Sequence, residues 1–315
     1  MSQAADTDAP IEPGNWPAEF DGVVRDCQAW LAERGETIVG SGCFRSQQLS
    51  GSLHTDFGPE EQDKDANQDY ALAWLPGDEG MRKRFRLVVA LGDGLTTSFR
   101  SECASALLCS LAMRALVEGD AALKPEDLAR HAFDAAGQSL GRLADELTRE
   151  PTASCPPGQF LSTWKYILRK GLLLQSTLTL AWLDRRCLHV AMVGDGGGVW
   201  RCYGPSPGGQ RANDSVLAQC DLDRHQVCAL GPAERSVREF DCWRQQELDG
   251  PFLCALHTDG VGRGVGGDPL ALLDELEELQ TAGGENSARR FIDRAVEERP
   301  QSFDDNLTLA VIAGE

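Results

Sequence analysis

The sequence lacks an excess of basic residues, and it lacks any long apolar run. Lysine and arginine number 30 against 49 aspartates and glutamates, so the formal net charge is -19. Nucleic acids and anionic membrane surfaces are bound through basic faces, and a helix needs roughly 20 apolar residues to span a bilayer. We therefore expect neither nucleic acid nor a membrane as a partner. The surplus of carboxylates serves either solubility or the binding of cations.

The eleven cysteines lack the paired spacing of zinc fingers and of redox motifs. None stands in a C-x-x-C pair, and several lie inside apolar stretches, where a thiol behaves as a small hydrophobic residue. An odd number of scattered thiols favours a reducing compartment. The first residues are polar and acidic, unlike a secretory signal peptide. The sequence thus predicts a reduced, cytoplasmic protein, and we expect a monomer.

The 315 residues are predicted to divide into an N-terminal part, 1–35, and a larger domain, 36–315. The N-terminal part is expected to be a loose tail that leads into a helix at 16–35. Two stretches, 47–67 and 205–223, are polar and rich in turn-forming residues, so we expect loops there.

Strand and helix patterns follow one another in blocks. Strands are predicted at 36–44, 70–75, 85–91, 176–184, 187–195, 197–204, 251–259 and 306–314. Helices are predicted at 101–119, 125–150, 159–170, 268–280 and 286–299. Tight turns between successive strands favour antiparallel pairing. Separate blocks of strands and helices indicate an α+β fold, with helices layered on antiparallel sheets.

Four aspartates stand at the ends of predicted strands. Asp93, inside a Gly-Asp-Gly sequence, and Asp259 end strands, whereas Asp69 and Asp305 begin them. Because the start of one antiparallel strand lies beside the end of its neighbour, the four carboxylates can meet at one edge of a sheet. Converging carboxylates repel one another unless cations neutralise them, and Mg²⁺ and Mn²⁺ prefer such oxygen ligands.

Each aspartate taken singly has a simpler interpretation, because Asp-Gly is a common turn dipeptide. The metal hypothesis therefore depends on the set of four. Residues 262–267, G-R-G-V-G-G, fit the dinucleotide-binding pattern G-x-G-x-x-G. No second strand with an acidic end follows at the required spacing, so we do not expect a dinucleotide site.

Five motifs, in the right order, resemble those of the metal-dependent protein phosphatases of type 2C, the PPM family. They are N-Q-D at 67–69, V-V-A-L-G-D-G at 88–94 with E-C-A-S after it, the hairpin sequence at 176–196, L-H-T-D-G-V at 256–261, and D-D-N-L-T-L-A-V-I at 304–312. Each motif alone is weak, but together they cover the chain from about residue 36 to its end. The chain is similar to a divergent, bacterial-type member of this family.

The resemblance implies a four-layer α-β-β-α sandwich, in which helices flank two central antiparallel sheets. It also implies two Mg²⁺ or Mn²⁺ ions at one edge, with Asp93 bridging them. The Gly94 carbonyl, Asp259 and Asp305 would complete the second ion's ligands. Asp69 would reach the ions directly or through water. The implied activity is hydrolysis of phosphoserine and phosphothreonine in proteins by a metal-activated water, with Asp69 and Asp93 as catalytic residues.

The sequence departs from the family pattern at three places. Lys64 stands where the family usually has an arginine that binds phosphate. Lys64 either binds phosphate as a catalytic residue, without the paired hydrogen bonds that arginine forms, or faces solvent. Asp195 matches one ligand of a third ion, but Arg263 replaces another ligand, which argues against that ion. Arg263 would instead contact phosphate. Leu-Thr-Thr-Ser at 95–98 replaces the usual glycine-rich continuation, so substrate choice is expected to differ.

Two functions from different classes stay open. The first is an active phosphatase whose partner is a protein phosphorylated on serine or threonine. The alternative is a catalytically silent phosphatase-like domain that binds a phosphoprotein or acts as a scaffold, which the altered positions Lys64 and Arg263 would suit. Retention of all four carboxylates favours the enzyme, because a binding module does not need them.

Overall fold

Two six-stranded antiparallel sheets form the centre of the protein. The computed structural model describes residues 18–46, 48–57, 67–95, 98, 100–149, 151, 160–204, 211–219, 242–248, 250–266, 268–281, 286–303 and 305–314. The first sheet has the order β1 (Gly35–Val39), β4 (Asp69–Pro76), β5 (Leu87–Asp93), β6 (Leu178–Leu183), β7 (Cys187–Val193) and β10 (Cys242–Glu247). The second sheet has the order β2 (Gly42–Arg45), β3 (Leu49–Asp56), β12 (Leu307–Gly314), β11 (Phe252–His257), β8 (Gly197–Tyr203) and β9 (Arg211–Gln219).

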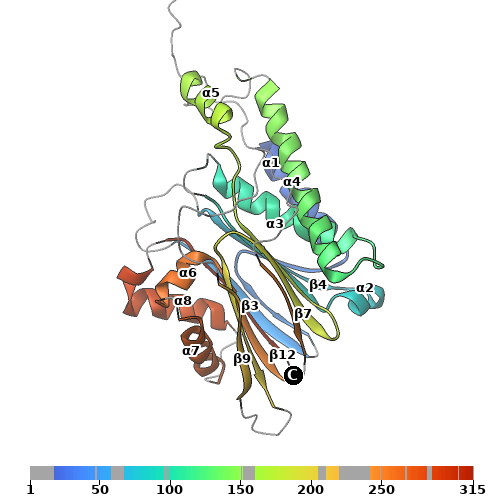
Figure 1. Ribbon diagram of the computed structural model, residues 1–315, viewed down its shortest axis with the longest axis vertical. Coiled ribbons are helices and arrows are strands. Elements are labelled where there is room, and N and C mark those ends of the chain that lie inside the picture. The colour runs from blue at the N-terminus through green and yellow to red at the C-terminus, as the bar shows by residue number, and fades with distance from the viewer. Residues whose placement is uncertain are drawn as a thin grey trace, which may run out of the picture.

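Helices cover the outer face of each sheet (Figure 1). The helices on the side of the first sheet are α1 (Ala18–Ala32), α3 (Ser101–Glu118) and α4 (Pro125–Arg149). Those on the second sheet are α6 (Asp259–Gly264), α7 (Pro269–Thr281) and α8 (Ser287–Glu298). The remaining helical segments are α2 (Glu79–Arg84), α5 (Leu161–Lys170) and a 3₁₀ turn, η1 (Pro300–Ser302). Among the described helices, none combines the length and the apolar character that crossing a membrane requires.

Alternation along the strands explains the layers. In β5, Val88 and Ala90 lie in the core between the first sheet and its helices, whereas Leu87, Val89 and Leu91 lie in the core between the two sheets. Successive side chains of a strand point to opposite faces, so a strand buried on both faces reads as a continuous apolar run. A third core lies between the second sheet and α7 and α8. The predicted α+β class and the four layers are confirmed.

The predicted loop at 47–67 was wrong in its first half, because β3 is a buried strand. Its small polar residues have specific partners. The Ser52 hydroxyl accepts a hydrogen bond from the Ala288 N–H at the start of α8, at 3.0 Å. A Cβ on Gly51 would lie 2.3 Å from the Phe44 ring. Close packing against α8 and β2 therefore replaces the apolar alternation that normally marks a strand.

Two other boundaries also differ from the prediction. Residues 36–44 form two strands in different sheets, because Gly40 takes a left-handed conformation (φ 69°) that turns the chain from β1 to β2. The loop predicted at 205–223 contains the edge strand β9. Likewise, β7 and β8 follow each other closely but lie in different sheets, so the connection that contains Asp195 crosses between the sheets.

The helix predicted at the N-terminus is α1, and it packs against the first sheet's helices. Phe20 and Leu31 are buried in that core, and the Trp74 indole N–H donates to the Leu31 carbonyl at 3.0 Å. The division of the chain at residue 35 stays a prediction.

Candidate metal centre

Asp69 and Asp93 are brought together by strand pairing. Asp69 is the first residue of β4, Asp93 is the last of β5, and the two are directly opposite in the antiparallel register. By the alternation of β5, Asp93 is on the same face as Leu91 and Val89, towards the second sheet. Residues that pair directly share a face, so both carboxylates enter the space between the sheets.

The backbone of Asp93 is held firmly by the start of β6. Its N–H donates to the Thr177 hydroxyl at 3.1 Å, and its carbonyl accepts from the Thr177 N–H and the Ser176 hydroxyl, both at 2.8 Å. The next residue, Gly94, must be glycine, because a Cβ there would lie 2.6 Å from the Ser101 carbonyl group. This part of the site is therefore rigid.

Asp69 is deeply buried, with 5% of its surface exposed. Its Oδ2 accepts a hydrogen bond from the Thr258 hydroxyl at 2.8 Å. The same hydroxyl accepts from the Thr308 N–H at 3.1 Å, which ties it to the second sheet. The other oxygen, Oδ1, is buried without a hydrogen-bond partner among the described residues.

The second sheet contributes further carboxylates. Oxygen atoms of Asp93, Asp195 and Asp259 lie within 4.8 Å of one another. Asp259 opens α6, just after β11, and Asp305 precedes β12. The helix and the 305–306 segment are very close, since a Cβ on Gly260 would lie 2.1 Å from the Asn306 carbonyl oxygen.

Arg263 forms ion pairs with two of these carboxylates, Asp259 and Asp305. It follows Asp259 by one helical turn in α6, and its guanidinium is 2.8 Å from Asp259 Oδ2 while it also pairs with Asp305 Oδ2. Sequence reasoning missed this contact, because the glycines of 260–264 concealed a short helix. The available signal was the four-residue spacing from Asp259, which places two side chains on one helix face.

The electrostatics show that the cluster is short of positive charge. Burial, opposed by its hydrogen bonds, raises the pKa of Asp69 to about 7. Burial is the main cause that holds the pKa of Asp93 well above its ordinary value, and repulsion from Asp69 and Asp259 adds to it. Burial followed by repulsion from Asp259 raises the pKa of Asp195 to about 6. Burial also raises the pKa of Asp259, although Arg263 opposes this.

This cluster fits divalent cations of the Mg²⁺ and Mn²⁺ kind. Its donors are carboxylate oxygens, and two of them, Asp69 Oδ1 and Asp259 Oδ1, are buried without a partner among the described residues. Buried carboxylates that lack partners are costly, and hard cations prefer such ligands. Among the described residues, Arg263 is the one positively charged side chain at the cluster, and it pairs with Asp259 and Asp305 only.

Three residues predicted to border the site, Lys64, Thr96 and Thr97, lie outside the described residues. Ser98 is described, and it is 7% exposed. Its hydroxyl accepts a hydrogen bond from the Gln175 N–H at 2.9 Å. Ser98 therefore fastens the segment after Gly94 to the segment before β6.

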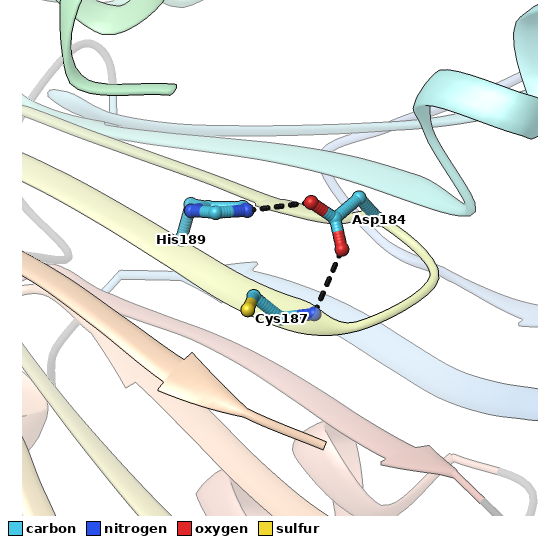
Figure 2. A group of neighbouring side chains, drawn as sticks. All are labelled: Asp184, Cys187 and His189. Carbon is cyan, nitrogen blue, oxygen red and sulfur yellow. Dashed lines mark hydrogen bonds and ion pairs between the residues drawn. The ribbon is translucent and has the colours of Figure 1, made fainter. Parts of the chain in front are cut away.

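Two other groups of possible ligands are present in the described part. One consists of Asp184, Cys187 and His189 in the β6–β7 hairpin (Figure 2). Both Asp184 oxygens are already in use, because they accept from two backbone N–H groups of the turn and pair with His189 Nε2 at 2.8 Å. This group holds a turn. The other group, His54, Asp56 and Asp293, is exposed at two of its three members.

No protein-family model and no curated protein matches the sequence. Solved structures match over most of its length. The serine/threonine phosphatase PstP/Ppp of Mycobacterium tuberculosis is 20% identical with a TM-score of 0.55, over 85% of this chain and 99% of that one. Stp1 from Staphylococcus aureus is 16% identical with a TM-score of 0.56, over 86% and 98%. The catalytic domain of PstP in complex with two manganese ions is 17% identical with a TM-score of 0.55, over 85% and 99%.

At these identities the similarity concerns the fold. Two packed antiparallel sheets with helices outside are common to all of them. The resemblance that the five motifs indicated is confirmed at this level: the chain has the fold of the bacterial type 2C serine/threonine phosphatases.

Proposed function

We propose that the chain is a Mg²⁺- or Mn²⁺-dependent phosphatase that acts on phosphoserine and phosphothreonine in proteins. One observation carries the proposal: oxygen atoms of Asp93, Asp195 and Asp259 lie within 4.8 Å of one another. Asp69, which pairs with Asp93, adds a buried Oδ1 that has no hydrogen-bond partner among the described residues. So many carboxylates are expensive to gather without cations. The phosphatase fold supports the same conclusion.

The chain's own residues would hold and place the cations. Asp93 and Asp69 approach from the first sheet, and Asp259 and Asp305 from the second; Asp195 lies on the connection between the sheets. The Gly94 carbonyl would be a further ligand. Bound divalent cations would polarise the phosphoryl oxygens and lower the pKa of water.

Positioning is what the described residues do for such a reaction. Thr177 and Ser176 fix the backbone at Asp93. Thr258 fixes the Asp69 carboxylate. Because phosphoryl transfer depends mainly on positioning and charge stabilisation, a rigid set of carboxylates matches the demands of the reaction. Arg263 neutralises part of the negative charge on one side of the set.

Hydrolysis of a phosphothreonine peptide tests the proposal. Phosphate release should require Mn²⁺ or Mg²⁺ and should stop when EDTA removes the cation. Asp93→Asn should lower the rate more than about 100-fold, the upper range for loss of a residue that only supports a metal ligand. Asp293→Asn, an exposed position on α8, is the matched control and should leave the rate unchanged. Full activity in Asp93→Asn would refute the metal assignment.

The alternative, a catalytically silent domain that binds a phosphoprotein, gains support from one observation, the pairing of Arg263 with Asp259 and Asp305. An arginine on two predicted metal ligands would weaken cation binding there. Absence of phosphate release with either cation, from protein that circular dichroism shows to be folded, would favour this alternative. Binding of the phosphothreonine peptide without hydrolysis would establish it.

A further inference from the structure

A cavity of about 830 Å³ lies at the end of the sandwich where β4 ends and β5 begins. Four arginines line it, Arg45, Arg82, Arg86 and Arg185, and among the described lining residues Glu36 alone is acidic. Arg45 ends β2, Arg82 lies in α2, Arg86 precedes β5 and Arg185 lies in the turn between β6 and β7. In a chain of net charge -19, four guanidinium groups around one hollow are a local reversal of sign.

The guanidinium groups of Arg82, Arg86 and Arg185 form no ion pair with any described residue. Arg86 donates to the Gln48 carbonyl at 3.4 Å, and Arg82 donates through Nε to the Pro76 carbonyl at 3.1 Å. Burial lowers the pKa of Arg86, and no carboxylate opposes this. A partly buried charge without a counter-charge costs free energy, and an anion bound in the cavity would offset that cost.

Arg185 lies in the turn between β6 and β7, where Asp184 bonds to Cys187 and His189 (Figure 2). Asp184 accepts hydrogen bonds from two backbone N–H groups of the turn, at 2.6 Å and 2.7 Å, and pairs with His189. The His189 ring stacks on the Trp182 ring with centroids 4.9 Å apart. A turn fixed in this way presents its exposed arginine with little entropy left to lose on binding.

We propose that this arginine-lined cavity binds a small molecule that carries several phosphate charges. Guanidinium groups bind phosphate oxygens through pairs of parallel hydrogen bonds. The volume falls in the range of small-molecule sites, about 300–1,000 Å³, and exceeds what one phosphate group needs. Leu75 and Pro76, at the end of β4, add an apolar part to the lining, which suits a ligand with a non-polar portion beside its phosphates.

The cavity is separate from the candidate metal centre. Asp69 and Pro76 are the first and last residues of β4. A strand rises about 3.3 Å per residue, so the cavity lies roughly 20 Å from the carboxylates. Binding there would therefore involve none of the predicted metal ligands, and it needs no metal ion.

Calorimetric titration of the full chain with pyrophosphate, after chelation and desalting to remove cations, tests the proposal at constant ionic strength. One saturable site per chain is expected, with weaker binding of inorganic phosphate. Arg86→Gln and Arg185→Gln should each weaken pyrophosphate binding by about tenfold. Arg86→Lys keeps the positive charge but cannot form the guanidinium's paired hydrogen bonds. Its affinity for pyrophosphate should therefore lie between those of the unchanged chain and Arg86→Gln. Arg142→Gln, at an exposed position of α4 outside the cavity lining, is the matched control and should bind as the unchanged chain does.

Several results would overturn the assignment. Arg185 is exposed, so Arg185→Gln should fold normally, and unchanged affinity in this variant would remove the arginines from the site. Lack of any saturable binding would do the same. Loss of pyrophosphate binding in Asp93→Asn would place the ligand at the metal centre. Binding of a phosphothreonine peptide, but not of pyrophosphate, with the same dependence on Arg185 would point to a protein ligand in place of a small molecule.

Discussion

Asp69 and Asp93 stand directly opposite each other in the register of β4 and β5, and both point towards the second sheet. Thr258, which follows β11 of that sheet, donates its hydroxyl hydrogen to Asp69. The candidate metal centre is thus built across the interface of the two sheets. Its geometry therefore depends on how the two sheets pack.

Thr258→Val should weaken Mn²⁺ binding about 10–100-fold, because Asp69 loses the hydroxyl that orients it. The Thr308 N–H would lose its partner as well, at a cost of about 1–3 kcal/mol in the free energy of unfolding. Calorimetric titration with Mn²⁺ and urea unfolding measure the two effects. Thr258→Ser retains the hydroxyl and should retain both properties. Equal Mn²⁺ affinity in the valine variant would contradict a role for Thr258 in orienting Asp69.

Arg263→Ala should tighten Mn²⁺ binding by about tenfold, because a cation at Asp259 and Asp305 would no longer compete with charged hydrogen bonds from the guanidinium. The metal-free variant should be less stable, since it leaves both carboxylates without that partner. Electron paramagnetic resonance of free Mn²⁺ follows the affinity. Arg289→Ala, which removes an exposed ion pair on α8, is the control. Weaker binding in Arg263→Ala would show that Arg263 supports the site instead.

The metal-free protein should lose stability as the pH rises from about 4 to about 7. Burial raises the pKa of Asp69 from 3.8 to about 7 and that of Asp195 to about 6, so the folded state holds protons that the unfolded chain has released. Stability from these groups is complete below the unfolded pKa and is lost as pH rises through the folded pKa.

Thermal unfolding of the chelated protein, followed between about pH 4 and about pH 8, measures this effect. Asp69→Asn should flatten the profile because it removes one titrating group. Saturating Mn²⁺ should also flatten it, since a cation stabilises the ionised carboxylates. A metal-free protein that becomes more stable with rising pH relative to Asp69→Asn would contradict the burial of these groups.

Arg201→Met should lower the free energy of unfolding by about 3 kcal/mol or more. The Arg201 side chain is 1% exposed, and its guanidinium binds Asp214 through two hydrogen bonds of 2.7 Å. It also pairs with Glu277 at 2.8 Å and with Asp274 at 2.9 Å. These contacts join β8, β9 and α7. Urea unfolding measures the loss. Arg201→Lys keeps the charge but not the paired hydrogen bonds of the guanidinium, so its free energy of unfolding should lie between those of the unchanged chain and Arg201→Met. Mn²⁺ affinity should stay the same; a change there would couple this network to the metal centre.

The strands that are buried on both faces, and the carboxylates of the candidate site, can be predicted from the amino-acid sequence alone. Continuous apolar runs such as 87–91 predict such strands, because each side of a central strand meets its own core. Asp93 and Asp259 stood out because an aspartate followed by glycine ends each run. The order of the five motifs then indicated the fold. All of these signals lie in short stretches of the chain, so they can be found without knowledge of the tertiary structure.

Which side chains come into contact depends on the tertiary structure. β3 was not predicted from the sequence because its small residues are set by tertiary contacts. Ser52 accepts a hydrogen bond from the start of α8, and Gly51 packs closely against the Phe44 ring. Arg263 acquired its partners because a short helix aims it at Asp259 while β12 brings Asp305 to the same place. The arginine-lined cavity likewise draws on several distant segments. Contacts between distant residues depend on the packing of the two sheets, and no local pattern in the sequence records that packing.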